Sequence, residues 1–165
     1  MGSWKSTIGL KLAETLGMVF VDIDDAIEEV MEMKISDIFM EFGENKFREM
    51  ETAYFVEIAK QTGHVFSTGG GIVLDPKNRK VLKKYGTTIF LKASTKILAD
   101  RINNTTKRPL LNDSKNIHLR LEQIWKERKI YYKNSSHHTL DTSKLNPAQV
   151  LDEILNLLKV KFENH

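Results

Sequence analysis

Residues 2–7 read Gly-Ser-Trp-Lys-Ser-Thr, and they stand at the head of a segment, residues 5–16, whose apolar side chains recur every four positions. That spacing predicts a helix, and Gly17 is placed to end it. A Lys followed by Ser or Thr at a helix N-terminus is typical of a phosphate-binding loop, because the free N–H groups of the first turn attract anions. A bare Lys-Ser-Thr also opens many helices that bind no phosphate, so this stretch indicates phosphate binding only together with other segments of the chain.

The motif assigns a role to each of its members. Lys5 reaches the outer phosphates, and the Ser6 hydroxyl binds Mg²⁺. The rest of the loop surrounds the phosphates through its backbone, and these positions are Gly2, Ser3, Trp4 and Thr7. We therefore expect ATP and Mg²⁺ to bind at this end of the molecule.

The motif departs from the full pattern G-x-x-x-x-G-K-[ST] in two ways, since the first Gly is absent and Trp4 replaces the second. Glycine is used there because the backbone approaches the phosphates closely and adopts a positive φ. A left-handed conformation costs a residue with a Cβ atom roughly 1–2 kcal/mol. Either the indole points outward and a looser loop survives, or nucleotide binding is weakened; the sequence favours the second.

Length, net charge and composition narrow the class of protein to which this chain can belong. The chain has 165 residues, a net charge of +3 and no cysteine, which fits one domain over residues 1–165 without disulfides or thiolate metal sites. No apolar run approaches the roughly 20 residues of a membrane span, and no secretory signal pattern opens the chain. We expect a cytoplasmic protein with an anionic substrate and with neither nucleic acid nor membrane as a partner.

Short apolar runs alternate with helical patterns along the chain. Strands are expected at residues 18–21, 64–68, 87–91 and 139–140, with helices between and after them. This alternation predicts a parallel sheet covered by helices on both faces. Such a sheet normally opens with a strand that leads into the first phosphate-binding turn, and here the chain begins in the turn itself.

Asp22 and Asp24 follow the first expected strand, at the edge where open α/β sheets bind ligands. Strand alternation would point both side chains to the same side. One could complete a Mg²⁺ shell while the other accepts a hydrogen bond from a substrate hydroxyl. The alternative is that these carboxylates only cap the next helix.

Two arginines lie on apolar helix faces. Arg128 belongs to a stripe with Leu121, Trp125 and Tyr132, and Arg48 stands three residues before Glu51. An inward arginine stays charged and needs an anionic partner. That partner is either an internal carboxylate, Glu51 in the case of Arg48, or a substrate carboxylate that both arginines bind.

Gly69, Gly70 and Gly71 follow the second expected strand directly. Successive glycines allow close backbone approach and expose N–H groups to a ligand, although three glycines can also form an ordinary loop.

Taken in order, six segments of the chain resemble those of the shikimate kinases. They are the D-x-D of residues 22–24, G-E-x-x-F-R-x-x-E at 43–51, S-T-G-G-G at 67–71, R-P-L-L at 108–111, E-R-x-x-x-Y at 127–132, and Asp141-Thr142 with Asn146-Pro147. The resemblance extends from residue 1 to about 160. It implies transfer of the ATP γ-phosphoryl group to the 3-hydroxyl of shikimate.

The resemblance also implies residue roles. Asp22 serves the metal with Ser6, with Ser67 near its water shell, whereas Asp24 holds shikimate and accepts its proton. Arg48, Arg128 and the three glycines bind shikimate, and Glu51 orients Arg48. Arg108 lies in a lid, about residues 103–115, and closes over the transferring group. Arg101 and Lys144 are similar to positions that contact the nucleotide base.

As a fold, the resemblance implies a three-layer α/β/α P-loop kinase domain, monomeric, with a shikimate-binding region at about residues 24–60. The family's sheet has five parallel strands with the first in the middle, and this chain supplies four. Two alternatives stay open: a degenerate homologue that binds shikimate but not ATP, and a kinase of another polyol acid such as gluconate.

Overall fold

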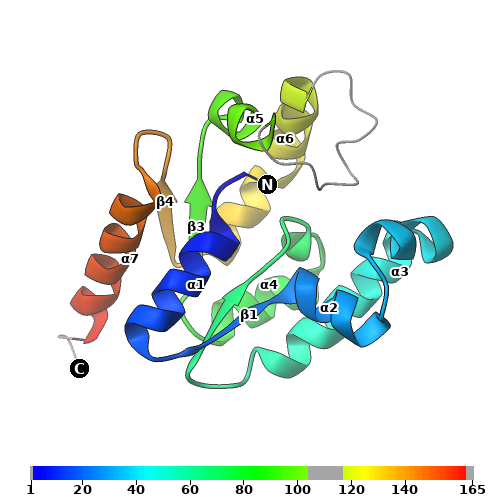
Figure 1. Cartoon of the computed structure of the whole chain (residues 1–165), viewed down its shortest axis with the longest axis horizontal. Helices are drawn as coiled ribbons and strands as arrows, with labels where there is room; N and C mark the ends of the chain where they lie inside the picture. The colour runs from blue at the N-terminus through cyan, green and yellow to red at the C-terminus, as the bar shows by residue number, and fades with distance from the viewer. Residues whose placement is uncertain (1, 104–116, 163–165) are drawn as a thin grey trace.

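The computed structural model describes residues 2–103 and 117–162, in which helices alternate with short strands (Figure 1). The helices are α1 (Lys5–Leu16), α2 (Ile23–Met31), α3 (Ile35–Ile58), α4 (Pro76–Lys84), α5 (Thr95–Asn103), α6 (Ile117–Ser135) and α7 (Pro147–Phe162), with a 3₁₀ turn η1 (Ile72–Leu74). The strands are β1 (Val19–Asp22), β2 (His64–Ser67), β3 (Ile89–Lys92) and β4 (His138–Asp141). All four expected strands are present, each within two residues of its predicted position.

The strands form two separate parallel pairs. β1 pairs with β2, with Val19 opposite His64, and β3 pairs with β4, with Ile89 opposite His138. Over the described residues no ladder joins β2 to β3, so the sheet is broken into two halves. The single continuous sheet implied by the resemblance is therefore not formed by the described residues.

Helices cover the strands on both faces and join the two halves. α1 contacts both β1 and β2, and it also packs beside α7, while α4 packs against α3 and α6 (Figure 1). One buried cluster joins α1, β3 and α7 through Ile8, Leu91 and Val150. A larger one lies between α2, α3, η1 and α4 and contains Ile23 and Phe47. The broken sheet is therefore held together by helix packing.

Two local features place side chains in the site. Asp22 caps α2, because its side chain accepts a hydrogen bond from the Asp24 amide, so α2 begins at Ile23. Gly43, with φ 80° and ψ 164°, interrupts α3 and separates a short first part from the longer part that carries Arg48. Among the described residues, no helix has the length and apolarity needed to cross a membrane.

Candidate active site

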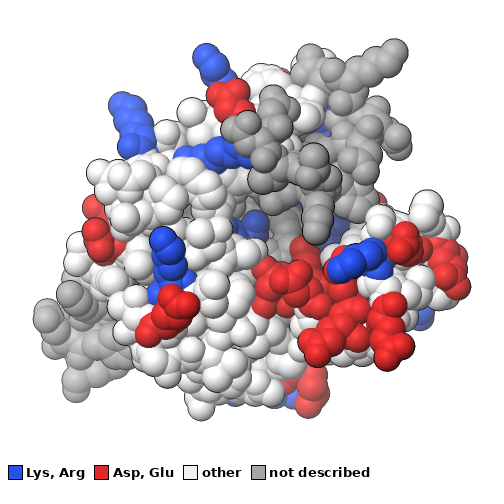
Figure 2. Space-filling view, in the orientation of Figure 1, with Lys and Arg blue, Asp and Glu red and all other residues white. Residues whose placement is uncertain are grey.

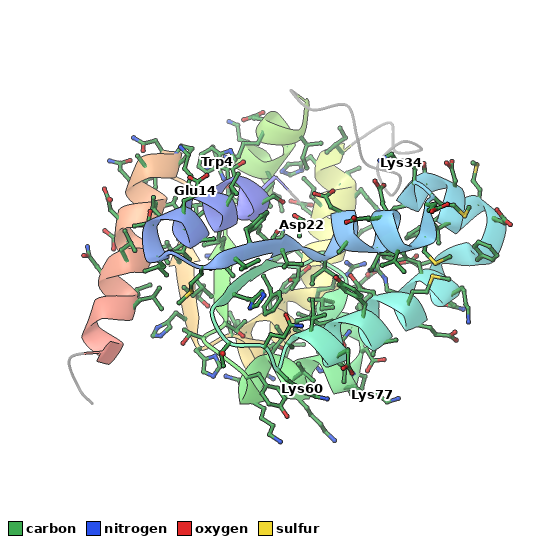
Figure 3. The ribbon with its side chains drawn as sticks, turned by 60° about the horizontal axis from the view of Figure 1, so that its bottom comes forward. Trp4, Glu14, Asp22, Lys34, Lys60 and Lys77 are labelled. Atoms are coloured by element: carbon green, nitrogen blue, oxygen red, sulfur yellow. The ribbon has the colours of Figure 1, made fainter. Side chains whose placement is uncertain are left out.

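A cavity of about 850 Å³ opens at the carboxyl ends of the strands. Its walls come from the start of α1, the β1–α2 junction, α3, the loop after β2, β3 and α6. Figure 3 shows Asp22 at the β1–α2 junction and Trp4 at the head of α1. At the rim of this cavity, acidic side chains gather over α2 and the first part of α3 (Figure 2), and Asp25 and Glu28 also line the cavity itself, beside Glu29, Glu32 and Asp37. An anionic ligand must therefore be attracted by cations inside the cavity.

One corner of the cavity brings together three oxygen ligands. The Ser6 hydroxyl donates to Asp22 Oδ2 at 2.5 Å and lies 3.3 Å from Ser67 Oγ. Magnesium ions in phosphotransfer sites take one or two protein oxygens and complete their shell with water and phosphate oxygens. The donor set of Ser6 and Asp22, with Ser67 beside it, fits that requirement, as the sequence predicted.

The phosphate loop keeps its backbone conformation despite Trp4. Trp4 has φ 61° and ψ 21°, in the left-handed region, and its carbonyl accepts the Ile8 amide at 2.8 Å. Ser3 is buried, and Ser3, Lys5 and Ser6 line the cavity. A Cβ on Gly2 would lie 3.0 Å from the Leu98 carbonyl oxygen, so the loop packs closely on α5. The prediction that position 4 requires a positive φ is confirmed.

The Trp4 side chain does not point freely outward. Its ring is half-buried and lies against the Arg101 guanidinium, whose Cζ is 3.4 Å from the ring centroid. Nothing in the sequence indicated this contact, because the two residues belong to distant segments, the head of α1 and the last turn of α5.

Asp24 lies in the first turn of α2 and lines the cavity. The argument from strand alternation was therefore wrong, although both aspartates do reach the same cavity through the strand-to-helix turn. Burial raises the pKa of Asp24, the neighbouring Asp22 charge adds to the rise, and Lys5 and Arg48 oppose it. A half-buried carboxylate with a raised pKa beside a lysine is suited to accept a proton.

Arg48 is tied to its own helix. It donates to Glu51 Oε2 at 2.7 Å and to Glu44 Oε1 at 3.2 Å. Glu51 is 1% exposed, and burial raises its pKa while the Arg48 guanidinium opposes that rise. The interpretation that Arg48 pairs with Glu51 is correct, and Arg48 also lines the cavity. Glu44 was missed as a partner, although its position one turn before Arg48 is a usable signal.

Arg128 has no comparable partner. It is 7% exposed, its Nη1 donates to the Gly70 carbonyl at 3.2 Å, and its Nε has no hydrogen-bond partner. Among the described residues no carboxylate lies within 4.0 Å of its guanidinium. The alternative of an internal carboxylate partner is therefore not found there. The stripe is confirmed, since Leu121, Trp125 and Tyr132 line the same cavity.

The glycine loop lies against these charged groups. A Cβ on Gly69 would lie 2.8 Å from Glu51 Oε1 and 2.9 Å from Asp24 Oδ1, and one on Gly71 would overlap the Arg48 guanidinium. The Gly70 carbonyl accepts hydrogen bonds from Arg128 and, at 2.7 Å, from the Tyr132 hydroxyl. Side chains at these positions would displace the arginines, so this run is more than an ordinary loop.

The remaining predicted residues are less central. Arg101 donates to Thr142 and contacts Trp4 but does not line the cavity. Lys144 is exposed in the turn after β4, and Thr7 is exposed on α1. Arg108 and nearly all of the predicted lid, residues 103–115, lie outside the described residues.

A phosphate loop at a helix N-terminus, a hydroxyl–carboxylate metal corner and a cavity at the strand ends define a small-molecule kinase with the P-loop α/β fold. The family model described as Shikimate kinase matches residues 1–159, so the chain belongs to the shikimate kinase family, whose members are ATP-dependent kinases.

Relatives and solved structures agree with this assignment. The chain is 42% identical over 159 residues to a shikimate kinase of Sulfurihydrogenibium sp. (strain YO3AOP1), covering 96% of this chain and 93% of the relative. It is 40% identical over 163 residues to that of Enterococcus faecalis (strain ATCC 700802 / V583), covering 96% and 94%. The structure of the shikimate kinase from Acinetobacter baumannii in complex with shikimate superposes with a TM-score of 0.92 at 32% identity, covering 98% of this chain and 89% of that one.

Proposed function

We propose that this chain transfers the γ-phosphoryl group of ATP to the 3-hydroxyl of shikimate, giving ADP and shikimate 3-phosphate. The observation that carries the proposal is the buried Arg128, whose Nε has no partner and which has no carboxylate within ion-pair distance among the described residues. A buried guanidinium stays charged, and since none of the described carboxylates reaches it, we infer that its partner is an anion from outside the chain. The carboxylate of shikimate supplies that anion.

At the substrate end, Arg48 and Arg128 bind the carboxylate of shikimate. Glu51 holds Arg48 in place, and the backbone of Gly69–Gly71 brings the ring close to both arginines. Asp24 accepts a hydrogen bond from the hydroxyl to be phosphorylated and takes up its proton as the new P–O bond forms. As that bond forms, the bond between the γ-phosphorus of ATP and its β,γ-bridging oxygen breaks, and ADP departs with that oxygen.

At the nucleotide end, the first turn of α1 and the residues Gly2–Thr7 bind the phosphates, with Lys5 at the outer ones. Ser6 and Asp22 would hold Mg²⁺, which when bound offsets the phosphate charge. Arg108 closes over the transferring group from the lid of residues 103–115, and Arg101 and Lys144 contact the base. Catalysis then rests mainly on positioning and on charge neutralisation.

The finer assignments that accompany this function are also proposals. One domain spans residues 1–165, with shikimate bound by the region of about residues 24–60. The protein acts as a cytoplasmic monomer without nucleic acid or membrane partners.

The test couples ADP release to added shikimate, in parallel with gluconate and with no acid. Shikimate-dependent ADP release supports the proposal, and equal or greater release with gluconate contradicts it. Calorimetry with shikimate and with ATP·Mg in separate titrations then identifies a degenerate homologue, which would bind only shikimate. Shikimate methyl ester is the matched ligand control, because it lacks the charge that Arg128 requires and should bind at least about 100-fold more weakly.

A further inference from the structure

Trp4 stands where the phosphate-loop pattern has a glycine, yet its backbone has the left-handed conformation that glycine adopts readily. It adopts the left-handed conformation directly before α1, and its carbonyl starts the helical hydrogen bonding at Ile8. No side-chain hydrogen bond caps the helix at this position. A residue with a Cβ atom is strained in this conformation, so other contacts must hold it there.

The contact that holds Trp4 is the stack on Arg101. The guanidinium carbon lies 3.4 Å from the centre of the indole ring, within the range of a strong cation–π interaction. The indole also packs against the apolar cluster of α1, β3 and α7. No carboxylate lies within 4.0 Å of Arg101 among the described residues, so its guanidinium faces the ring and the oxygens of Thr142.

Arg101 is itself fixed to the sheet. Its Nη1 donates to Thr142 Oγ1 at 3.2 Å and its Nη2 to the Thr142 carbonyl at 2.8 Å. Thr142 is fully buried, and its hydroxyl donates to the Lys92 carbonyl at the end of β3. A continuous chain of contacts therefore runs from the phosphate loop through α5 to the ends of β4 and β3.

We propose that Trp4 is a positioning residue, whose stack on Arg101 holds the phosphate loop against α5 in the left-handed conformation that places Lys5 and the start of α1 at the nucleotide phosphates. The role of the loop in binding phosphates rests on the proposed function. In this view the indole compensates for the missing glycine and does not block the nucleotide. This differs from the expectation that Trp4 weakens nucleotide binding.

The proposal predicts an unusual order of variants at one position. Trp4→Ala keeps the strain of a Cβ atom and loses the stack, so its Kd for ADP·Mg should rise about tenfold. Trp4→Gly loses the stack but also the strain, so its Kd should stay within about threefold of the parent value. Trp4→Phe retains part of the stack, so its Kd for ADP·Mg should lie between those of the parent and of Trp4→Ala. In an Arg101→Met background, Trp4→Ala should change the Kd by less than about twofold, because the stack is already lost.

Calorimetry with ADP·Mg measures these values, and a parallel shikimate titration shows that each variant is folded. The proposal is overturned if Trp4→Ala binds ADP·Mg as tightly as the parent or more tightly, since the indole would then be an obstruction. It is equally overturned if Trp4→Ala weakens binding to the same extent with and without Arg101.

A measurement without nucleotide separates this proposal from the proposed function. In a Trp125→Phe background Trp4 is the remaining tryptophan, and its emission reports its surroundings. Arg101→Met should shift that emission to longer wavelength as the ring becomes exposed, and an unchanged spectrum contradicts the stack. If the stack is seen but no variant binds ADP·Mg, the positioning role and the nucleotide half of the proposed function both fail, while shikimate binding is judged by its own titration.

Discussion

The two ends of the cavity are built in different ways. At the acid-binding end, Arg48, Glu51 and Arg128 are held by helices and by the backbone of the glycine loop, in a well-packed region. At the phosphate-binding end, the loop depends on one strained residue and its stack on Arg101, beside the break between β2 and β3. Under the proposed assignment, selectivity for the acid rests on local packing, whereas nucleotide binding rests on two strand pairs that no ladder joins among the described residues.

The largest effect is expected at the acid-binding end. Arg128→Met keeps the length of the side chain but removes the buried charge, which we expect to lower kcat/KM for shikimate about 1000-fold, or about 4 kcal/mol. The fall in kcat/KM should come mainly from a higher KM for shikimate, and the Kd for ADP·Mg should not change.

Lys129→Met is the matched control, because Lys129 is the exposed neighbour on the same helix. It removes the same formal charge outside the cavity, so its kinetics should match those of the parent. An Arg128→Met variant that keeps parent-level KM for shikimate would show that the two ends do not differ in the way described.

A smaller effect is expected from the group that holds Arg48. Glu51→Gln preserves shape but removes the buried charge that pairs with Arg48 at 2.7 Å. We expect KM for shikimate to rise about 30-fold, or about 2 kcal/mol, with KM for ATP unchanged. Glu49→Gln is the control, because Glu49 is an exposed residue on the same helix whose ion pair is with exposed Lys46. Equal effects on both Michaelis constants would mean that Glu51 acts through overall stability.

The sequence predicted the burial of Arg128 and the pairing of Arg48 with Glu51 because the signals for both are local. The helical stripe placed Arg128 inside, and Glu51 lies one turn from Arg48. The four strands and their helices were predicted for the same reason, since periodicity and caps act over a few residues. The stack between Trp4 and Arg101 was not predictable, because it depends on how α1 packs on α5. The position of Asp24 was misjudged, since the cap at Asp22 starts α2 earlier than the strand pattern indicated.

The pH dependence should also belong to the acid-binding end. Burial and the neighbouring Asp22 raise the pKa of Asp24, and a base acts only when ionised. Activity should therefore fall on acidification at a higher pH than for an ordinary aspartate, about tenfold per pH unit below that pKa. Rate against pH at saturating ATP·Mg measures this, and Asp24→Asn should be slow with the acidic limb lost. An acidic limb that persists in Asp24→Asn assigns it to another group.

The same raised pKa has an opposite consequence for stability. Because the folded-state pKa of Asp24 lies above its unfolded value, ionised Asp24 opposes folding. Its cost is absent below the unfolded pKa, grows as the pH rises towards the folded pKa, and is full above it. Asp24→Asn should therefore be at least as stable as the parent near neutral pH, so its loss of activity cannot be attributed to unfolding.

The smallest effect is expected at the phosphate-binding end, and it concerns the gap between β2 and β3. The cavity runs along β3 from Thr88 to Ala93 and reaches the buried Ser135 hydroxyl. Within the described part of the chain, β3 has no ladder partner on the side of β2, and that hydroxyl has no hydrogen-bond partner. A designed segment of five β-branched residues placed directly ahead of the phosphate loop can enter this gap as a strand parallel to both halves, because buried parallel strands are apolar throughout. We expect the melting temperature to rise by about 5 °C and KM for ATP to fall about threefold. KM for shikimate should not change, since Arg48 and Arg128 are held by helices and by the glycine loop.

A Gly-Ser segment of equal length is the control, and it should change neither the melting temperature nor KM for ATP. If the apolar strand improved shikimate binding as much as ATP binding, the two ends would share one support, and the contrast between them would have to be abandoned.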